Sequence, residues 1–225
     1  MLNAKVFSEI VNARHSVRGF LPARVPAADI RSVLEDAQRS PSNCNTQPWG
    51  VHIVSGAKRD ELSAALIEAN NNGRFSMDYS FDTADFYEEY KSRSSAQGAV
   101  YYKALGVKRE DYDERKTIGD RNLTFFGAPH VALLCVPRIG DSVRTASDVG
   151  MYGQTFLLSL VAHGLGGVPQ TMLGMYADTV REVLKIDHKL NLLFGISFGY
   201  PDKNCSSNSF RMDRVALEDS VTFHE

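Results

Sequence analysis

Apolar residues repeat at helical spacing in several parts of the chain. In residues 3–13, Val6, Phe7, Ile10 and Val11 share one face, which predicts a short amphipathic helix. Similar patterns predict helices over residues 26–39, 58–70, 146–163 and 177–186.

Three shorter segments are predicted to be strands. Residues 51–55 alternate between faces, and residues 130–136 form a continuous apolar run between Pro129 and Pro137, as in a buried strand. A third strand is expected over residues 191–199. These strands are too few and too widely separated for a Rossmann array, so the pattern favours an α+β sandwich with a central sheet.

The stretch from residue 71 to residue 128 has a different texture, rich in Tyr, Phe, Arg, Asp and Glu. We interpret it as a mainly helical excursion within a single domain that spans residues 1–225. It is either a cover over a pocket or a peripheral helical layer. The aromatic residues within it could be stacking walls or ordinary core: Tyr101, Tyr102, Phe125 and Phe126.

Composition and charge narrow the classes of partner. The formal net charge is −2 and the pI is near 6.3, so no global positive field favours nucleic acid or anionic lipid. No segment approaches the ~18 apolar residues of a membrane span, and the first residues lack the apolar core of a signal peptide. The three cysteines show no CxxC spacing, which argues against disulfides and structural zinc and favours a reducing cytoplasm.

The glycine-rich stretch from Gly164 to Pro169 does not fit a dinucleotide-binding motif. That motif needs a strand, then glycines, then a helix N-terminus that faces phosphate. Here the glycines follow a predicted helix, so Gly164 is expected to end that helix with a positive φ. The small residues still allow backbone to approach a ligand closely.

A polar loop, Pro41-Ser42-Asn43-Cys44-Asn45-Thr46-Gln47-Pro48-Trp49, follows the second predicted helix. Pro48 excludes a helix interior and is expected to hold Gln47 in extended geometry. The loop carries many hydrogen-bond donors and acceptors. It suits a planar ligand with many heteroatoms; the alternative is an ordinary polar loop.

Arg14, Ser16 and Arg18 alternate along a segment that follows the first predicted helix. In an extended segment, alternate residues lie on one side, so two guanidinium groups and a hydroxyl could clamp a phosphate. The alternative is a solvated basic edge. Arg211 and Arg214, near the end of the chain, could add positive charge.

Protein nucleophiles and metals have little support. Cys135 lies in an apolar strand and is expected to be inert, and Cys44 has no adjacent histidine in sequence. No HExxH, GxSxG or P-loop motif is present, and the six histidines are scattered. The residues therefore suggest a pocket for a planar, phosphate-bearing molecule such as flavin mononucleotide (FMN), which carries its own redox chemistry.

Four motifs occur in the order typical of one family. The sequence resembles the FMN-dependent nitroreductases in Arg14-His15-Ser16-Val17-Arg18-Gly19-Phe20, in the loop from Pro41 to Trp49, in Gly164 to Gln170 and in Phe198-Gly199-Tyr200-Pro201-Asp202. The resemblance extends from about residue 8 to the C-terminus. It implies a nitroreductase-like α/β/α sandwich with a mainly antiparallel sheet. It further implies a homodimer, with two FMN sites at the interface and a C-terminal tail that extends onto the partner.

The resemblance also implies roles at the phosphate end of FMN. Arg14 and Ser16, with His15 between them, would hold the phosphate and the ribityl chain. Arg211 would reach the phosphate from the tail, with Arg214 as the alternative.

Further residues would surround the flavin ring. Arg18 would lie near the N1/O2 edge and stabilise negative charge on the reduced ring. Pro169, Gln170 and Thr171 would lie by the ring, with a backbone N–H near N5. The contact to N5 must come from backbone, because this chain has Thr171-Met172 where some members have Glu-Gly. The polar loop would contribute mainly to the partner subunit's flavin, through Pro41, Ser42, Asn43, Asn45 and Gln47.

The implied activity is electron transfer from NADH or NADPH through flavin N5 to a nitroaromatic or quinone-like acceptor, by ping-pong exchange. No protein residue would be catalytic in itself. The alternatives are other flavin chemistry, such as reductive dehalogenation or flavin breakdown, an FMN-binding module without turnover, and a hydrolase that uses Cys44. The sequence does not choose between NADH and NADPH, and it does not name the natural acceptor.

Overall fold

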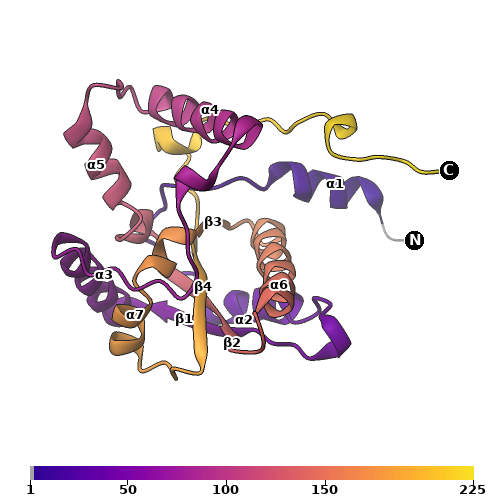
Figure 1. Ribbon diagram of the computed structural model, residues 1–225, viewed down its shortest axis with the longest axis horizontal. Helices are drawn as coiled ribbons and strands as arrows, with labels where there is room; N and C mark the ends of the chain where they lie inside the picture. Colours follow the sequence, from indigo (N-terminus) through magenta and orange to yellow (C-terminus); the bar gives the residue numbers. More distant parts are fainter. Residues whose placement is uncertain (1–2) are drawn as a thin grey trace.

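A four-stranded antiparallel sheet forms the centre of the protein (Figure 1). The computed structural model describes residues 3–225; residues 1–2, which the single-domain prediction includes, lie outside the described part. The strand order is β1-β2-β4-β3. The strands are β1 (Gly50–Ser55), β2 (His130–Pro137), β3 (Gly166–Gln170) and β4 (Leu190–Gly199).

Helices cover both faces of the sheet. α3 (Gly56–Asn71) and α7 (Ala177–Leu184) pack on one face, and α2 (Ala27–Ala37) and α6 (Val143–Ala162) pack on the other. Strand β2 serves both layers, because Val131 and Leu133 join one apolar cluster while Ala132 and Leu134 join the other. This alternation follows from the period of two in a strand and explains the continuous apolar run in the sequence. The predicted α+β sandwich with an antiparallel sheet is confirmed.

The predicted helices and strands are present, with ends that differ by at most three residues. Strand β3 was missed, because Gly166 and Gly167 have low strand propensity. Their absence of side chains is nevertheless required for packing. A Cβ on Gly166 would lie 2.6 Å from Val17 Cγ2, and one on Gly167 would lie 2.9 Å from Leu160 Cδ1. Gly164 has φ +70° just after α6, as predicted.

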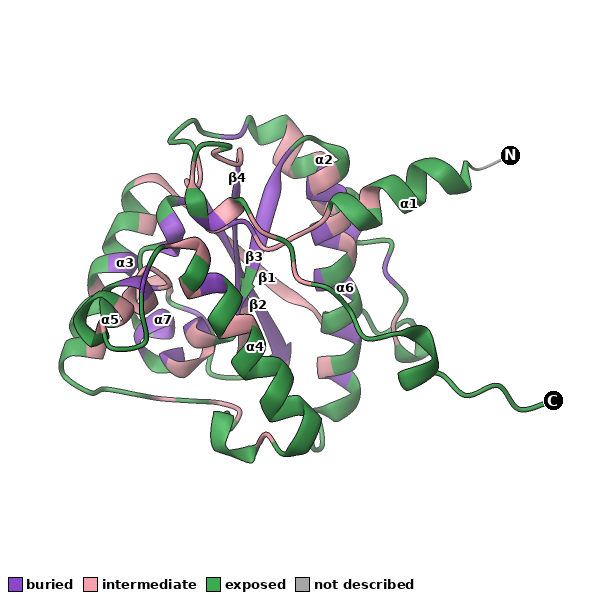
Figure 2. Ribbon diagram, turned by 90° about the horizontal axis from the view of Figure 1, so that it is seen from above, coloured by how far each residue is buried: buried purple, intermediate pink, exposed green. Residues whose placement is uncertain are grey.

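Residues 71–128 contain helices α4 (Glu88–Ala104) and α5 (Tyr112–Asp120). They also contain the single turns η2 (Thr83–Asp85) and η3 (Phe125–Gly127). Helix α4 lies apart from the sheet and is largely exposed (Figures 1 and 2). Its inner end belongs to a small separate cluster formed by Tyr101, Val107 and Ile118.

Helix α1 (Ala4–Ala13) and the C-terminal tail extend away from the sheet on the same side of the molecule (Figure 1). The apolar face predicted for α1 is real but uncovered: Val6 is 47% exposed and Phe7 is 61% exposed. None of the helices in residues 3–225 has both the length and the apolar character needed to cross a membrane.

Candidate functional site

The segment after α1 runs along the open edge of strand β3. Ser16 forms a parallel bridge with Gly167, and the backbone N–H of Val17 donates to the Gly167 carbonyl at 3.2 Å. Val17 and Gly19 are buried. Side chains alternate along extended backbone, and Arg14, Ser16 and Arg18, which alternate with these two buried residues, line a cavity on the other side.

A cavity of about 710 Å³ opens on that side. It is formed by the end of α1, the segment after it, α4, α6 and the tail. Its lining residues include Arg14, His15, Ser16, Arg18, Gln97, Gln154, Phe210, Arg211, Met212 and Arg214. The structure thus brings together Arg14 and Arg211, which are almost 200 positions apart in the sequence.

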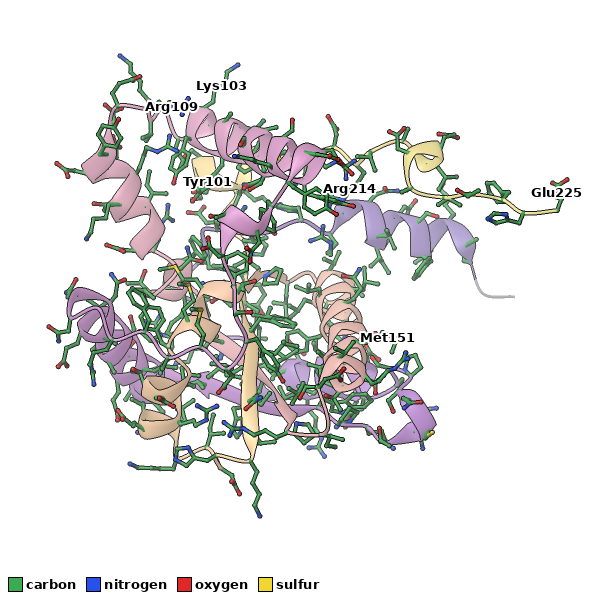
Figure 3. The ribbon with its side chains drawn as sticks, viewed as in Figure 1. Tyr101, Lys103, Arg109, Met151, Arg214 and Glu225 are labelled. Atoms are coloured by element: carbon green, nitrogen blue, oxygen red, sulfur yellow. The ribbon has the colours of Figure 1, made fainter. Side chains whose placement is uncertain are left out.

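Four guanidinium groups line this cavity without a carboxylate partner. Among residues 3–225, Arg14, Arg18, Arg211 and Arg214 form no ion pair within 4.0 Å. Figure 3 shows Arg214 beside α1. Unpaired cations around one cavity favour an anionic ligand, and the fork of donors on each guanidinium matches phosphate oxygens.

The titration of His15 reflects this positive surrounding. Its Nδ1–H donates to the Ala13 carbonyl at 2.9 Å. Burial lowers the pKa of His15, the hydrogen bond to Ala13 opposes this, and the charges of Arg211, Arg14 and Arg18 lower the pKa further. Burial and then the charge of Arg214 lower the pKa of Arg14.

A second cavity, of about 190 Å³, adjoins the first and shares Arg18 and Gln97 with it. Its other walls include Tyr101, Tyr102, Ile118, Gly119, Asn122, Phe126, Val168 and Pro169. The Arg18 guanidinium lies over the Tyr101 ring, 5.0 Å from its centroid. Tyr101 belongs to α4, and Figure 3 shows it on the side of this helix that faces the sheet. A cation that connects a polar cavity to an aromatic one could face both ends of a ligand.

The aromatic residues of the excursion divide between the two roles considered for them. Tyr101, Tyr102 and Phe126 line the second cavity, although Tyr101 and Phe126 are also buried. Phe125 belongs to the main core.

The three residues predicted to lie by the flavin ring, at the end of β3 and just after it, do not share one cavity. Pro169 lines the second cavity. The Gln170 side chain is buried and turned toward the sheet, where it accepts from the Ser197 hydroxyl and donates to the Asn122 carbonyl at 2.9 Å. Thr171 lines a different cavity of about 360 Å³, beside Phe81 and Phe194.

The polar loop lies elsewhere in the same chain. Its residues line none of these cavities. The backbone N–H of Asn43 donates to Asp148 on α6, and the exposed side chains of the loop face outward. None of the cavities that Arg14 and Arg18 line is therefore bounded by the predicted loop residues Pro41, Ser42, Asn43, Asn45 and Gln47.

The expectation that Gln47 is extended was wrong, because its φ is +48°. Local hydrogen bonds outweigh the restriction by Pro48. The N–H of Gln47 donates to Ser42 Oγ at 2.9 Å, and its side chain donates to the Asn45 carbonyl at 3.1 Å. Cys44 and Asn45 also have positive φ, so the loop is a compact turn.

Neither of the two cysteines considered as nucleophiles forms a hydrogen bond to a basic group in the described residues. Cys44 is exposed, and its hydrogen bond is to Asn43 Oδ1 at 3.6 Å. Burial raises the pKa of Cys135 to about 12, so its thiol is inert at neutral pH. Residues 3–225 contain no group of three or more acidic, His or Cys side chains placed to hold a metal ion.

Sequence reasoning missed Gln97, Gln154, Asn122 and the residues that fix the backbone of Arg18. A glutamine on a helix has no local signature, and these side chains reach the site only through tertiary packing. The proximity of Gln97 to Arg18 depends on how α4 folds back over the segment after α1.

Known proteins resemble this chain over nearly its whole length. The sequence profile of the Nitroreductase family matches residues 11–200. The chain is 40% identical over 220 residues to nitroreductase NfnB of Mycolicibacterium smegmatis, covering 98% of this chain and 93% of that protein. It is 32% identical over 224 residues to 4-nitrobenzoate reductase of Pseudomonas putida, covering 96% and 95%.

Solved structures give the same result. The FMN-dependent nitroreductase NfnB from Mycobacterium smegmatis, in complex with NADPH, superposes with a TM-score of 0.94 at 39% identity, covering 99% of this chain and 100% of that one. The FMN and NADPH-dependent nitroreductase NfnB from Sphigopyxis sp. strain HMH superposes with a TM-score of 0.93 at 31% identity, covering 97% and 99%. The predicted resemblance is confirmed, and this chain belongs to the nitroreductase family.

Proposed function

We propose that the protein is an FMN-dependent oxidoreductase that takes electrons from NADH or NADPH and reduces nitroaromatic or quinone-like acceptors. The observation that carries this proposal is the pair of adjoining cavities, joined at Arg18. One is lined by unpaired arginines, and the other is walled by aromatic rings. The larger cavity, of about 710 Å³, has the volume of a small-molecule site, and the smaller one adjoins it.

The larger cavity fits the phosphate and ribityl end of FMN. Arg14, Ser16 and Arg211 supply guanidinium and hydroxyl donors from two segments, and Arg214 adds a further charge. We propose that His15 takes part through its free Nε2, since Nδ1–H is already engaged with the chain. A phosphate dianion would offset the repulsion among these cations.

The smaller cavity fits part of a flat ring. When bound, FMN supplies the redox chemistry by taking up two electrons from the nicotinamide and releasing them to the acceptor. Arg18 supplies a preorganised positive charge where reduction places negative charge. Pro169 bounds the same cavity, and we propose that the β3 backbone, not the buried Gln170 side chain, faces the ring.

The relatives suggest the partners of the reaction. The Mycobacterium protein binds NADPH, and the Pseudomonas protein is a 4-nitrobenzoate reductase. We propose the same classes of electron donor and acceptor for this chain. Helix α4, which lines both cavities through Gln97, is largely exposed. We propose that the electron donor and the acceptor use the same open site in turn, which fits ping-pong exchange.

We further propose a cytoplasmic homodimer. The polar loop displays amide and hydroxyl groups away from its own protomer's cavities, so it is available to complete the site of a partner. The uncovered apolar face of α1 and the extended tail provide surface for such an association. The three free cysteines fit a reducing compartment.

The test is a visible spectrum of the purified protein, followed by anaerobic mixing with NADH and with NADPH. Flavin absorbance that bleaches with either donor and returns on addition of 4-nitrobenzoate or a quinone supports the proposal. No affinity for added FMN would refute it. Bound FMN that neither donor bleaches would identify a binding module without turnover.

A further inference from the structure

Arg18 holds an unusual position. Its side chain is partly buried, lines both cavities, and has no carboxylate within 4.0 Å among residues 3–225. The contact that the structure gives its guanidinium is the face of the Tyr101 ring, at 5.0 Å. A cation–π contact holds the guanidinium over the ring but does not fix the direction of its N–H groups. The direction of the Arg18 side chain therefore depends on how firmly its backbone is held.

Asn208 holds one side of that backbone. Its Oδ1 accepts a hydrogen bond from the N–H of Arg18 at 2.7 Å. Its Nδ2 donates to the carbonyls of Gly19 at 2.8 Å and Asp202 at 2.9 Å. The amide is thus fully oriented, and it connects the segment after α1 to the beginning of the tail.

Arg121 holds the other side. Its Nη2 donates to the carbonyl of Arg18 at 2.8 Å, and its Nη1 donates to the hydroxyl of Ser207 at 3.3 Å. Ser207 is buried and precedes Asn208. Both peptide groups that flank the Cα of Arg18 are therefore held by side chains that lie 103 and 190 positions away in the sequence.

Arg121 is also anchored where the excursion returns to the body of the protein. The next residue, Asn122, accepts from Gln170 on β3, and the carbonyl of Leu123 accepts from Ser63 on α3 at 2.9 Å. Arg121 forms no ion pair within 4.0 Å in residues 3–225, so it does not act as a partner in a structural salt bridge. Its charge adds to that of Arg18 beside Tyr101.

We propose that Arg121 and Asn208 are positioning residues that fix the Arg18 guanidinium toward the negative charge of reduced FMN. This inference rests on the proposed function. The clamp connects three separate segments: the excursion through Arg121, the edge of the sheet through Arg18, and the tail through Asn208. It makes the potential of the bound flavin depend on residues that line neither cavity.

The test compares Arg121→Met with Arg115→Met. Arg115 is a matched control, because it belongs to the same excursion and stacks on a neighbouring tyrosine, with its guanidinium 3.7 Å from the Tyr102 centroid. FMN affinity is measured by fluorescence titration, the flavin midpoint potential by equilibration with a reference dye, and folding by thermal melting.

We expect Arg121→Met to weaken the binding of reduced FMN at least tenfold more than that of oxidised FMN. That ratio corresponds to a potential lower by about 30 mV for a two-electron couple. Arg121→Lys, which can still donate to the Arg18 carbonyl, restores most of the potential. Arg115→Met matches the wild type. Asn208→Ala lowers the potential in the same direction and serves if Arg121→Met does not fold.

A double variant tests whether the effect passes through Arg18. Once Arg18→Met has removed the cation, adding Arg121→Met should lower the potential no further, since coupled residues are not additive. A wild-type potential in folded Arg121→Met or Asn208→Ala would overturn the clamp. So would equal shifts with and without Arg18. A wild-type protein that fails to bind FMN would instead refute the proposed function.

Discussion

Replacing Arg14 with methionine is expected to affect FMN binding and the stability of the free protein differently. Arg14 lines the larger cavity beside Arg214, whose charge, after burial, lowers the pKa of Arg14. In the free protein this arrangement is repulsive. It becomes favourable only when an anion enters the cavity, so the same residue has opposite effects in the two states.

The magnitude follows from the hydrogen bond that the Arg14 guanidinium would donate to the FMN phosphate. A hydrogen bond to a charged group contributes about 1.5–3 kcal/mol. At about 1.4 kcal/mol for each tenfold change in Kd, removal of one such bond weakens FMN binding roughly 10- to 140-fold. Relief of repulsion at a partly exposed site is worth about 0.2–1 kcal/mol, and methionine keeps much of the apolar stem. The Tm of the free protein should therefore be unchanged or slightly higher.

The assay is a fluorescence titration with FMN and, in parallel, with riboflavin, which lacks the phosphate. Arg14→Met should weaken FMN binding and leave riboflavin binding close to that of the wild type. Arg31→Met is the control, because Arg31 pairs with Glu35 on the exposed face of α2, away from both cavities. The same pair of ligands, applied to Arg211→Met and Arg214→Met, ranks the two tail arginines.

Two results would refute this reasoning. Equal weakening of FMN and riboflavin would place Arg14 away from the phosphate. A marked fall in the Tm of the free protein would mean that Arg14 stabilises the fold, and that repulsion from the neighbouring arginines is not its main interaction.

Two further predictions concern stability. Burial and then the charges of Arg24 and Arg59 lower the pKa of His130, whose Nε2 accepts the N–H of Val25 at 3.0 Å. The unfolded chain therefore binds a proton more readily than the folded protein, so stability should fall as pH drops below about 6.5. His130→Gln should flatten the dependence of Tm on pH relative to wild type. An unchanged slope would contradict this. Asp78 accepts hydrogen bonds from the buried Arg181 guanidinium and from the N–H of Leu192. Because removal of one partner of a buried ion pair is costly, Asp78→Asn should destabilise the protein by about 3 kcal/mol in urea unfolding. A destabilisation below about 1 kcal/mol would show that the pair is solvated.

The helices and strands predicted correctly from the sequence are those whose spacing of apolar residues fits only one type of secondary structure. The run from His130 to Val136 is apolar throughout because both faces of β2 are covered. Strand β3 escaped detection for the opposite reason: its first two residues are glycines, selected by close packing against Val17 and Leu160 and not by strand propensity. Such packing depends on the assembled fold.

Some residues of the candidate site could likewise be grouped from the sequence, and others could not. Arg14, Ser16 and Arg18 could be grouped from their alternation, which is local information. Their relation to Arg121 and Asn208 could not, because those hydrogen bonds cross 103 and 190 positions. The conformation of Gln47 was also out of reach, since hydrogen bonds within the loop decide it against the preference imposed by Pro48.

The arginines that line the larger cavity include Arg14 and Arg18, which lie at the edge of the sheet. Strand β3 is one of the two edge strands, and within the described residues only the bridge at Ser16 extends the sheet beyond it. The backbone next to β3 is therefore fixed, while the side chains on its outer side remain uncovered. Like charges that are close together repel one another, so other contacts must hold the segment that carries them in place. Here the bridge to Gly167 and the clamp at Arg18 fix it from two directions. These backbone contacts fix where the Arg14 and Arg18 side chains begin, and we propose that a bound phosphate then offsets the repulsion among the cations.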